Sequence, residues 1–140
     1  MKEVCIDNTS GGDALYTREV RQALEGIPTK LDIIGFDACL MQMMEVAYEV
    51  RNEASYMVGS EQTEPGDGWP YHFILMDLRS NPGMTPAQLA ATIVTRYGES
   101  YSGTETQAAV DLSKISALAT SLSSFASAMI ASDTEWINYF

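Results

Sequence analysis

LDIIGFDACLM, residues 31–41, is the stretch that decides the fold of this 140-residue chain. Residues 31–36 form an apolar run broken only by Asp32 and Gly35, directly after a helix-like segment. A short buried run in that position is typical of a central strand in a parallel sheet. Apolar residues recur at helical spacing over residues 40–51, so the pattern predicts that a second helix follows the strand.

The elements on either side extend the alternation of strand and helix. A further strand is expected at residues 54–59, and Thr85, followed by Pro86 and Gln88, has the features of a helix start. This order favours a three-layer α/β fold with a mainly parallel sheet. The other expected elements are strands at 4–6 and 105–112, polar loops at 7–13 and 61–69, and helices at 17–26, 70–78, 85–97 and 113–131, the last as a packed amphipathic helix.

Composition and charge narrow the functional classes. An apolar share of 46% is enough for the core of one domain, and we see no run that approaches the roughly 20 apolar residues of a membrane span. A net charge of −11, with only 8 Lys and Arg, argues against nucleic-acid binding. It fits simple solubility or a basic partner. Two cysteines and one histidine are too few for a disulfide scaffold or a structural zinc site, although one disulfide stays open.

Cys39 is the candidate nucleophile because it follows the buried strand at the expected start of a helix. Ligands bind beyond the carboxyl ends of such strands, and helix-start N–H groups favour thiolate. The alternative is an inert, buried cysteine. Asp37 would oppose ionisation, so a catalytic Cys39 needs a base nearby. The one histidine, His72, is more simply explained as a half-exposed polar residue at a helix start.

Four landmarks together resemble the clostripain family of cysteine peptidases. They are KLDIIGFDACLM at 30–41, EVAYE at 45–49, GSE at 59–61 and EPGDGWPY at 64–71. The resemblance runs from about Val4 to about Leu78 and fades after that. It implies a caspase-like fold, incomplete in this chain, and a Cys–His dyad with Cys39 as the nucleophile. It also implies cleavage of peptides or proteins after Arg or Lys.

The resemblance further implies an acidic pocket for the basic side chain, with Asp37 and Asp67 as its carboxylates. Asp67 lies between two glycines and has the alternative role of a turn residue. Glu61 and Glu64 are weaker candidates that would only make the rim acidic.

The family's histidine is expected before Met1, so residues 1–140 are interpreted as the C-terminal part of a peptidase domain. The upstream part of the same polypeptide would then be its partner. The family processes itself after a basic residue, and Lys2 lies in about that region. The resemblance also implies a secreted or cell-surface bacterial protein. The alternative is an inactive relative that binds basic peptides.

Calcium is considered because some relatives use it. The segment from Asp7 superficially resembles a calcium loop, but Arg18 occupies the twelfth position, where an EF-hand requires Glu. No metal or cofactor is therefore expected, although an irregular calcium site stays open.

Overall fold

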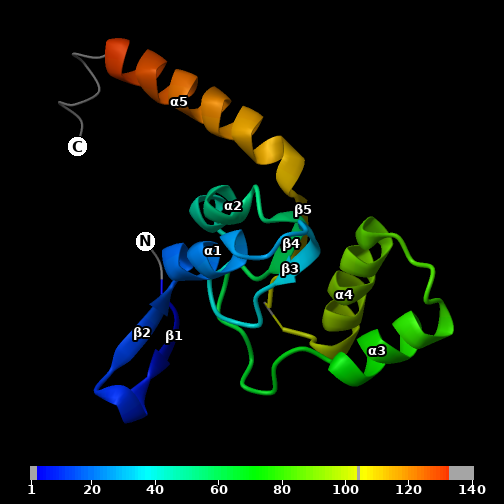
Figure 1. Cartoon of the computed structure of the whole chain (residues 1–140). Coiled ribbons are helices and arrows are strands. Elements are labelled where there is room, and N and C mark those ends of the chain that lie inside the picture. Colours follow the sequence, from blue (N-terminus) through cyan, green and yellow to red (C-terminus); the bar gives the residue numbers. More distant parts are fainter. Residues whose placement is uncertain (1–2, 104, 133–140) are drawn as a thin grey trace.

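A three-stranded sheet lies at the centre of the chain (Figure 1). This computed structural model describes residues 3–103 and 105–132. β3 (Leu31–Gly35) pairs in parallel with β4 (Ala54–Gly59), which pairs antiparallel with β5 (Ala108–Asp111). The predicted strands at 31–36 and 54–59 are thus confirmed, and the third is shorter than expected. The central position predicted for the first strand is wrong for the described sheet, in which β3 lies at an edge and β4 at the centre.

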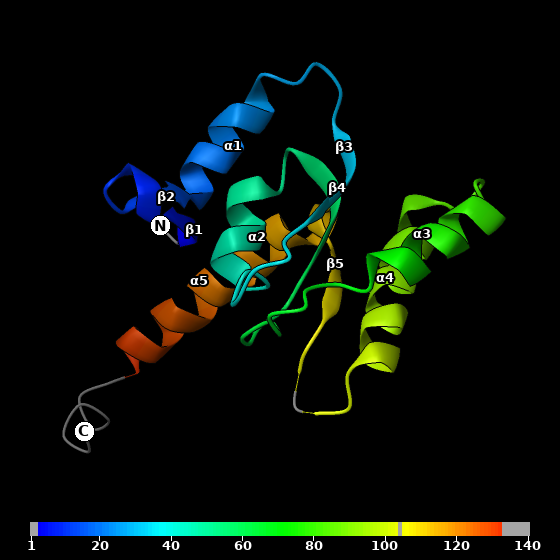
Figure 2. The same ribbon diagram turned by 90° about the horizontal axis from the view of Figure 1, so that it is seen from below.

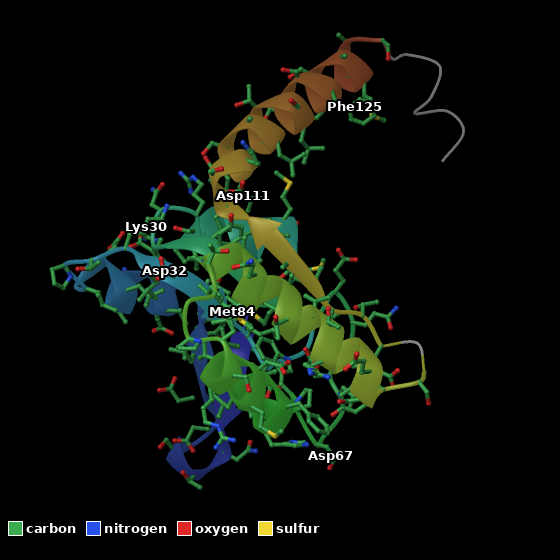
Figure 3. All side chains as sticks on the ribbon, turned by 90° about the vertical axis from the view of Figure 1, so that its right-hand side faces the viewer. Lys30, Asp32, Asp67, Met84, Asp111 and Phe125 are labelled. Carbon is green, nitrogen blue, oxygen red and sulfur yellow. The ribbon has the colours of Figure 1, made fainter. Side chains whose placement is uncertain are left out.

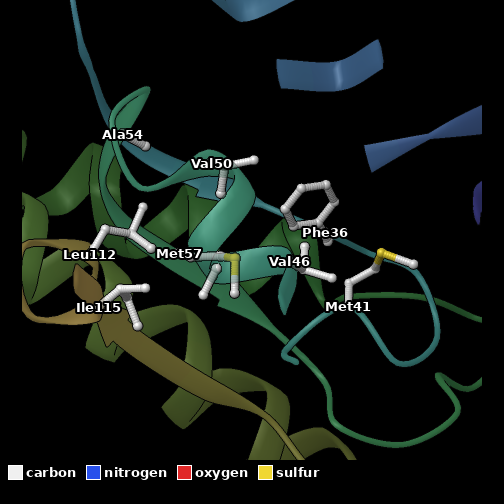
Figure 4. Packing of buried hydrophobic residues seen from close by; sticks show 9 residues of the cluster. Phe36, Met41, Val46, Val50, Ala54, Met57, Leu112 and Ile115 are labelled. Carbon is white, nitrogen blue, oxygen red and sulfur yellow. The ribbon is translucent and has the colours of Figure 1, made fainter. Parts of the chain in front are cut away.

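Helices cover both faces of this sheet (Figure 2). α1 (Thr17–Glu25) and α2 (Met44–Val50) lie on one face, and α3 (Tyr71–Ser80) and α4 (Pro86–Ser100) lie on the other. Successive β4 side chains point to opposite faces, so Met57 joins the core beside α2, while Val58 joins the core beside α4. The three-layer α/β fold is therefore confirmed. The first core consists of Phe36, Met41, Val46, Ala47, Val50, Ala54, Met57, Leu112 and Ile115 (Figure 4).

A hairpin precedes the sheet and was only half predicted. β1 (Glu3–Asp7) pairs antiparallel with β2 (Asp13–Tyr16), and the 3-10 turn Asn8–Ser10 lies between them. The expected loop at 7–13 therefore leads into a second strand. That strand has only four residues, too few for its weak alternation to stand out.

α2 begins later than the pattern predicted. Residues 40–43 form a non-helical turn in which Leu40 has a φ of 61° and Met43 is extended. A left-handed residue cannot continue a right-handed helix. The helix therefore starts at Met44, and Leu40 and Met43, which the pattern included in the helix, are exposed.

α5 (Ile115–Ala131) follows the 3-10 turn Leu112–Lys114 and projects away from the sheet (Figure 1). Its predicted apolar stripe is present, but the prediction of a packed helix is wrong for the described residues. Leu112–Ala131 is also long and apolar enough to cross a membrane, by length and composition alone. The expectation that the chain has no run of membrane-spanning length was therefore wrong by the criterion of length and composition. The exposed stripe consists of Leu118, Leu122, Phe125 and Met129.

Candidate active site

Cys39 lies in the turn between β3 and α2, with an exposed side chain and a free thiol. Because α2 starts only at Met44, Cys39 is not at a helix start, and that part of the prediction is wrong. A different N–H group reaches the sulfur: the backbone N–H of Glu64 donates to Cys39 Sγ at 3.2 Å. The loop after β4 therefore contacts the candidate nucleophile directly.

Asp37 fixes that same loop from two residues before Cys39. Its Oδ2 accepts hydrogen bonds from the backbone N–H of Trp69, at 3.1 Å, and from the Tyr71 hydroxyl, at 3.0 Å. Burial, followed by the bond to Asp37, raises the pKa of Tyr71 to about 12. The Asp37 carboxylate is thus bound to the end of the loop and to the first residue of α3.

Gly68 lets the loop approach Asp37 closely. Its φ is +66°, and a Cβ at this position would lie 2.8 Å from Asp37 Oδ2. Both the left-handed backbone and the short distance require glycine here. The Tyr101 hydroxyl, at the end of α4, donates to the Gly68 carbonyl at 2.5 Å, so the loop is held from two sides.

Asp67 is exposed on the loop, at the edge of the molecule in Figure 3. Burial is the main cause of the raised pKa of Tyr101, and Asp67 and Asp37 are the next two contributors. Asp67 thus lies on the loop that Asp37 holds from the turn after β3. Both residues are exposed, but only Asp37 accepts hydrogen bonds from the loop and from α3. Neither carboxylate forms a salt bridge among the described residues.

The sequence suggested that Glu64 lies on the rim of the acidic pocket, but its carboxylate points under the loop. Its side chain is half-buried, and Oε1 accepts a hydrogen bond from the Trp69 indole N–H at 3.2 Å. Burial raises the pKa of Glu64, and the nearby Asp37 adds to the rise. Glu61, in contrast, is exposed. One feature of the sequence could have indicated this contact: Glu64 lies five residues before a tryptophan in a Gly-rich loop.

His72 is exposed in the first turn of α3, with its ring 3.9 Å from that of Phe73. The hydrogen bonds of the described residues include none between His72 and Cys39. Cys39 borders an open hollow of about 700 Å³, between the turn that carries Cys39 and the β1–β2 hairpin. The hollow is lined by Glu3, Val4, Cys5, Ile6, Tyr16, Ala38, Cys39 and Leu40.

The described residues include no group of three or more His, Cys, Asp or Glu side chains that could hold a metal ion. In the candidate calcium loop, Asp7 accepts hydrogen bonds from Thr9 and Ser10. These bonds lower the pKa of Asp7 to about 2, and the bond from the Thr9 side chain contributes most. The Asp7 oxygens thus stabilise the turn itself.

Cys39 lies just beyond the carboxyl end of β3, an edge strand of the described sheet, and a loop that carries carboxylates contacts it, an arrangement compatible with a cysteine-peptidase site on an α/β sheet. The family model described as the clostripain family matches residues 1–139. The chain therefore belongs to the clostripain family. A search among curated proteins gave no match.

Solved structures similar to this chain are cysteine proteases. A secreted cysteine protease from Bacteroides thetaiotaomicron, in complex with an irreversible peptide inhibitor, is 29% identical with a TM-score of 0.68; the match covers 82% of this chain and 35% of that one. A B. fragilis cysteine protease is 26% identical, with a TM-score of 0.62 and coverage of 78% and 48%. A clostripain from Bacteroides thetaiotaomicron bound to the peptide inhibitor BTN-VLTK-AOMK is 23% identical, with a TM-score of 0.67 and coverage of 83% and 51%. The chain thus spans about half or less of each of these structures.

Proposed function

We propose that the chain is the cysteine-bearing part of an endopeptidase that cleaves after Arg or Lys, with Cys39 as the nucleophile. The single observation that carries this proposal is the contact between Cys39 Sγ and the loop of Glu64–Trp69, at 3.2 Å. It puts the thiol against the loop that carries Asp67 and that Asp37 holds through the Trp69 N–H. A basic side chain entering next to the nucleophile would be paired with a carboxylate there.

The catalytic base in this proposal is a histidine that lies before Met1 in the longer polypeptide. The hollow beside Cys39 has room for a turn that carries an imidazole. His72 is a poorer candidate because its ring lies against Phe73 on an exposed helix start.

The chemistry follows that of a Cys–His dyad. The imidazole takes the thiol proton, and the Cys39 sulfur attacks the scissile carbonyl. The C–N bond then breaks, and the imidazolium gives its proton to the departing amine. Water attacks the thioester, which releases the new carboxyl group and restores the thiol. N–H groups near Cys39 and near the histidine would stabilise the oxyanion.

Support for a basic substrate comes from charge and from a relative. The loop gathers carboxylates in a chain with a net charge of −11, which favours a cationic partner. The inhibitor of the 23% identical clostripain carries the peptide VLTK, which contains a lysine. We propose a secreted location, since one relative is described as secreted.

Peptide cleavage by two forms of the protein tests the proposal. The form extended upstream through the histidine should cleave peptides after Arg and Lys and lose this activity with Cys39→Ala. The 140-residue chain alone should show no turnover. Turnover by the short chain that is abolished by His72→Ala would make His72 the base. Binding of basic peptides by the extended form without cleavage would identify an inactive relative.

A further inference from the structure

Glu64 connects Cys39 to the acidic loop through both its backbone and its side chain. Its N–H donates to Cys39 Sγ at 3.2 Å, and its Oε1 accepts from the indole N–H of Trp69 at 3.2 Å. The backbone N–H of Trp69 in turn donates to Asp37 Oδ2 at 3.1 Å. Since Asp37 is two residues before Cys39, these three hydrogen bonds close a ring that starts and ends at the nucleophile turn.

The second carboxylate oxygen of Glu64 points inward. Oε2 is buried, as is the hydroxyl of Tyr97, and neither has a hydrogen-bond partner of normal geometry among the described residues. Burial raises the pKa of Tyr97, and the Glu64 carboxylate adds to the rise. This oxygen, Oε2, is out of reach of a substrate side chain, although the Glu64 side chain as a whole is half-buried. It can, however, restrain the loop from beneath.

Trp69 makes the restraint rigid. Its side chain is buried, and its ring approaches Gly35 so closely that a Cβ there would lie 2.9 Å from it. Because the Trp69 ring packs against Gly35, the last residue of β3, its indole N–H is a donor in a fixed position. A carboxylate bound to it keeps the Glu64 peptide group at one distance from the turn that carries Cys39.

We propose that Glu64 is a positioning residue for Cys39. Its carboxyl group, anchored on the Trp69 indole, fixes the peptide N–H that holds the cysteine sulfur. An N–H aimed at sulfur favours the reactive thiolate form. The inference rests on the proposed function only in so far as Cys39 is the nucleophile, and its effect on the thiol is measurable without proteolysis.

Alkylation kinetics of Cys39 in the 140-residue chain test this role. All variants carry Cys5→Ser, so that iodoacetamide reports on Cys39 alone, and mass spectrometry follows the reaction. Glu64→Gln should keep the rate within about twofold, since its amide oxygen accepts the same indole N–H. Glu64→Ala removes the acceptor, and Glu64→Asp places it on a shorter side chain. Each of these two variants should lower the rate at least about threefold.

The matched control is Glu61→Ala, which removes an exposed carboxylate three residues away. It should leave the alkylation rate within about twofold of the parent. Glu64→Asp keeps the charge, so it decides the outcome even if Glu64→Ala does not fold. Rates for Glu64→Asp equal to those of the parent would overturn the proposal. So would a fall for Glu64→Gln as large as that for Glu64→Asp.

The extended, histidine-containing form separates this inference from the proposed function. Glu64→Asp should lower kcat with little change in KM for a peptide with Arg, because the residue acts on the nucleophile and not on the pocket. A rise in KM alone would contradict the positioning role. If that form cleaves no peptide at all, the proposed function fails, while the alkylation result still decides the role of Glu64.

Discussion

At the scale of single residues, Asp37 and Asp67 differ in what their carboxylates do. Both side chains are exposed, but Asp37 accepts two hydrogen bonds, from the loop and from α3, whereas Asp67 has no side-chain hydrogen bond among the described residues. Asp67 is therefore free to bind a cation. Asp37 is the structural member of the pair, whatever else it binds.

This difference predicts the effect of neutralising Asp67. In the extended form, Asp67→Asn should reduce cleavage after Arg and Lys at least about tenfold, since losing one partner of a desolvated ion pair costs about 2–5 kcal/mol. Cleavage after an uncharged residue should change much less. Asp37→Asn is the comparison and should depress all substrates, because it also loosens the loop. Equal losses on basic and neutral peptides for Asp67→Asn would reduce it to a turn residue.

Glu64 predicts a pH dependence of stability. Burial raises its pKa in the folded state, so the folded protein holds this proton more tightly than the unfolded chain does. The stability linked to Glu64 is then full below the unfolded pKa and is lost as the pH rises through the folded pKa. Urea unfolding from about pH 4 to about pH 8 should show a smaller loss for Glu64→Gln than for the parent. Parallel curves would contradict a raised pKa.

Sequence reasoning predicted part of this candidate site. It identified Cys39, Asp37 and Asp67 as candidates, and the structure puts Cys39 and Asp37 in contact with the same loop. It missed the inward orientation of Glu64, because a linear pattern does not show which carboxylate the Trp69 indole meets. It also expected helix-start N–H groups at Cys39, which the turn at 40–43 excludes.

At the scale of elements, the loop of residues 61–69 depends on one glycine. Gly68→Ala should destabilise the protein by about 1–2 kcal/mol, from left-handed strain and from the contact with Asp37. It should also slow the alkylation of Cys39. Gly66→Ala is the matched control, since a Cβ at Gly66 meets nothing within 4 Å and its φ is not left-handed. Equal urea midpoints for the two variants would refute this account of the loop.

α5 and the turn before it provide a second comparison. Leu112 is 2% exposed in the first core, whereas Leu122 is 50% exposed on the helix. Leu112→Ala should cost about 2–5 kcal/mol of unfolding free energy, and Leu122→Ala less than about 0.5 kcal/mol. A large loss for Leu122→Ala in urea unfolding would mean that the α5 stripe is covered in solution.

Element boundaries were the least predictable feature of the fold. The capping signals at Thr85 and Gln88 predicted the start of α4 well, because the cap is formed by neighbouring residues. The start of α2 was wrong by four residues, since the left-handed Leu40 results from how the turn packs and not from its own propensity. The α5 stripe gave the helix but not its surroundings, because periodicity shows which face is apolar and not what covers it.

At the scale of the whole molecule, the chain forms a sheet with helices on both faces, and the turn that carries Cys39 borders a hollow. It spans 35–51% of the three similar structures described above. In our account, the remaining catalytic group is supplied by the upstream part of the same polypeptide.

The central claim is that Cys39 is the nucleophile of a peptidase that selects basic residues. The most direct measurement is mass spectrometry of the extended form after treatment with an irreversible peptide probe that ends in Lys. The account predicts a single covalent label on Cys39, none on Cys5, no label after Cys39→Ala, and much slower labelling by the same probe with an uncharged residue in place of Lys. Labelling of Cys5, or equal labelling by the charged and uncharged probes, would contradict it.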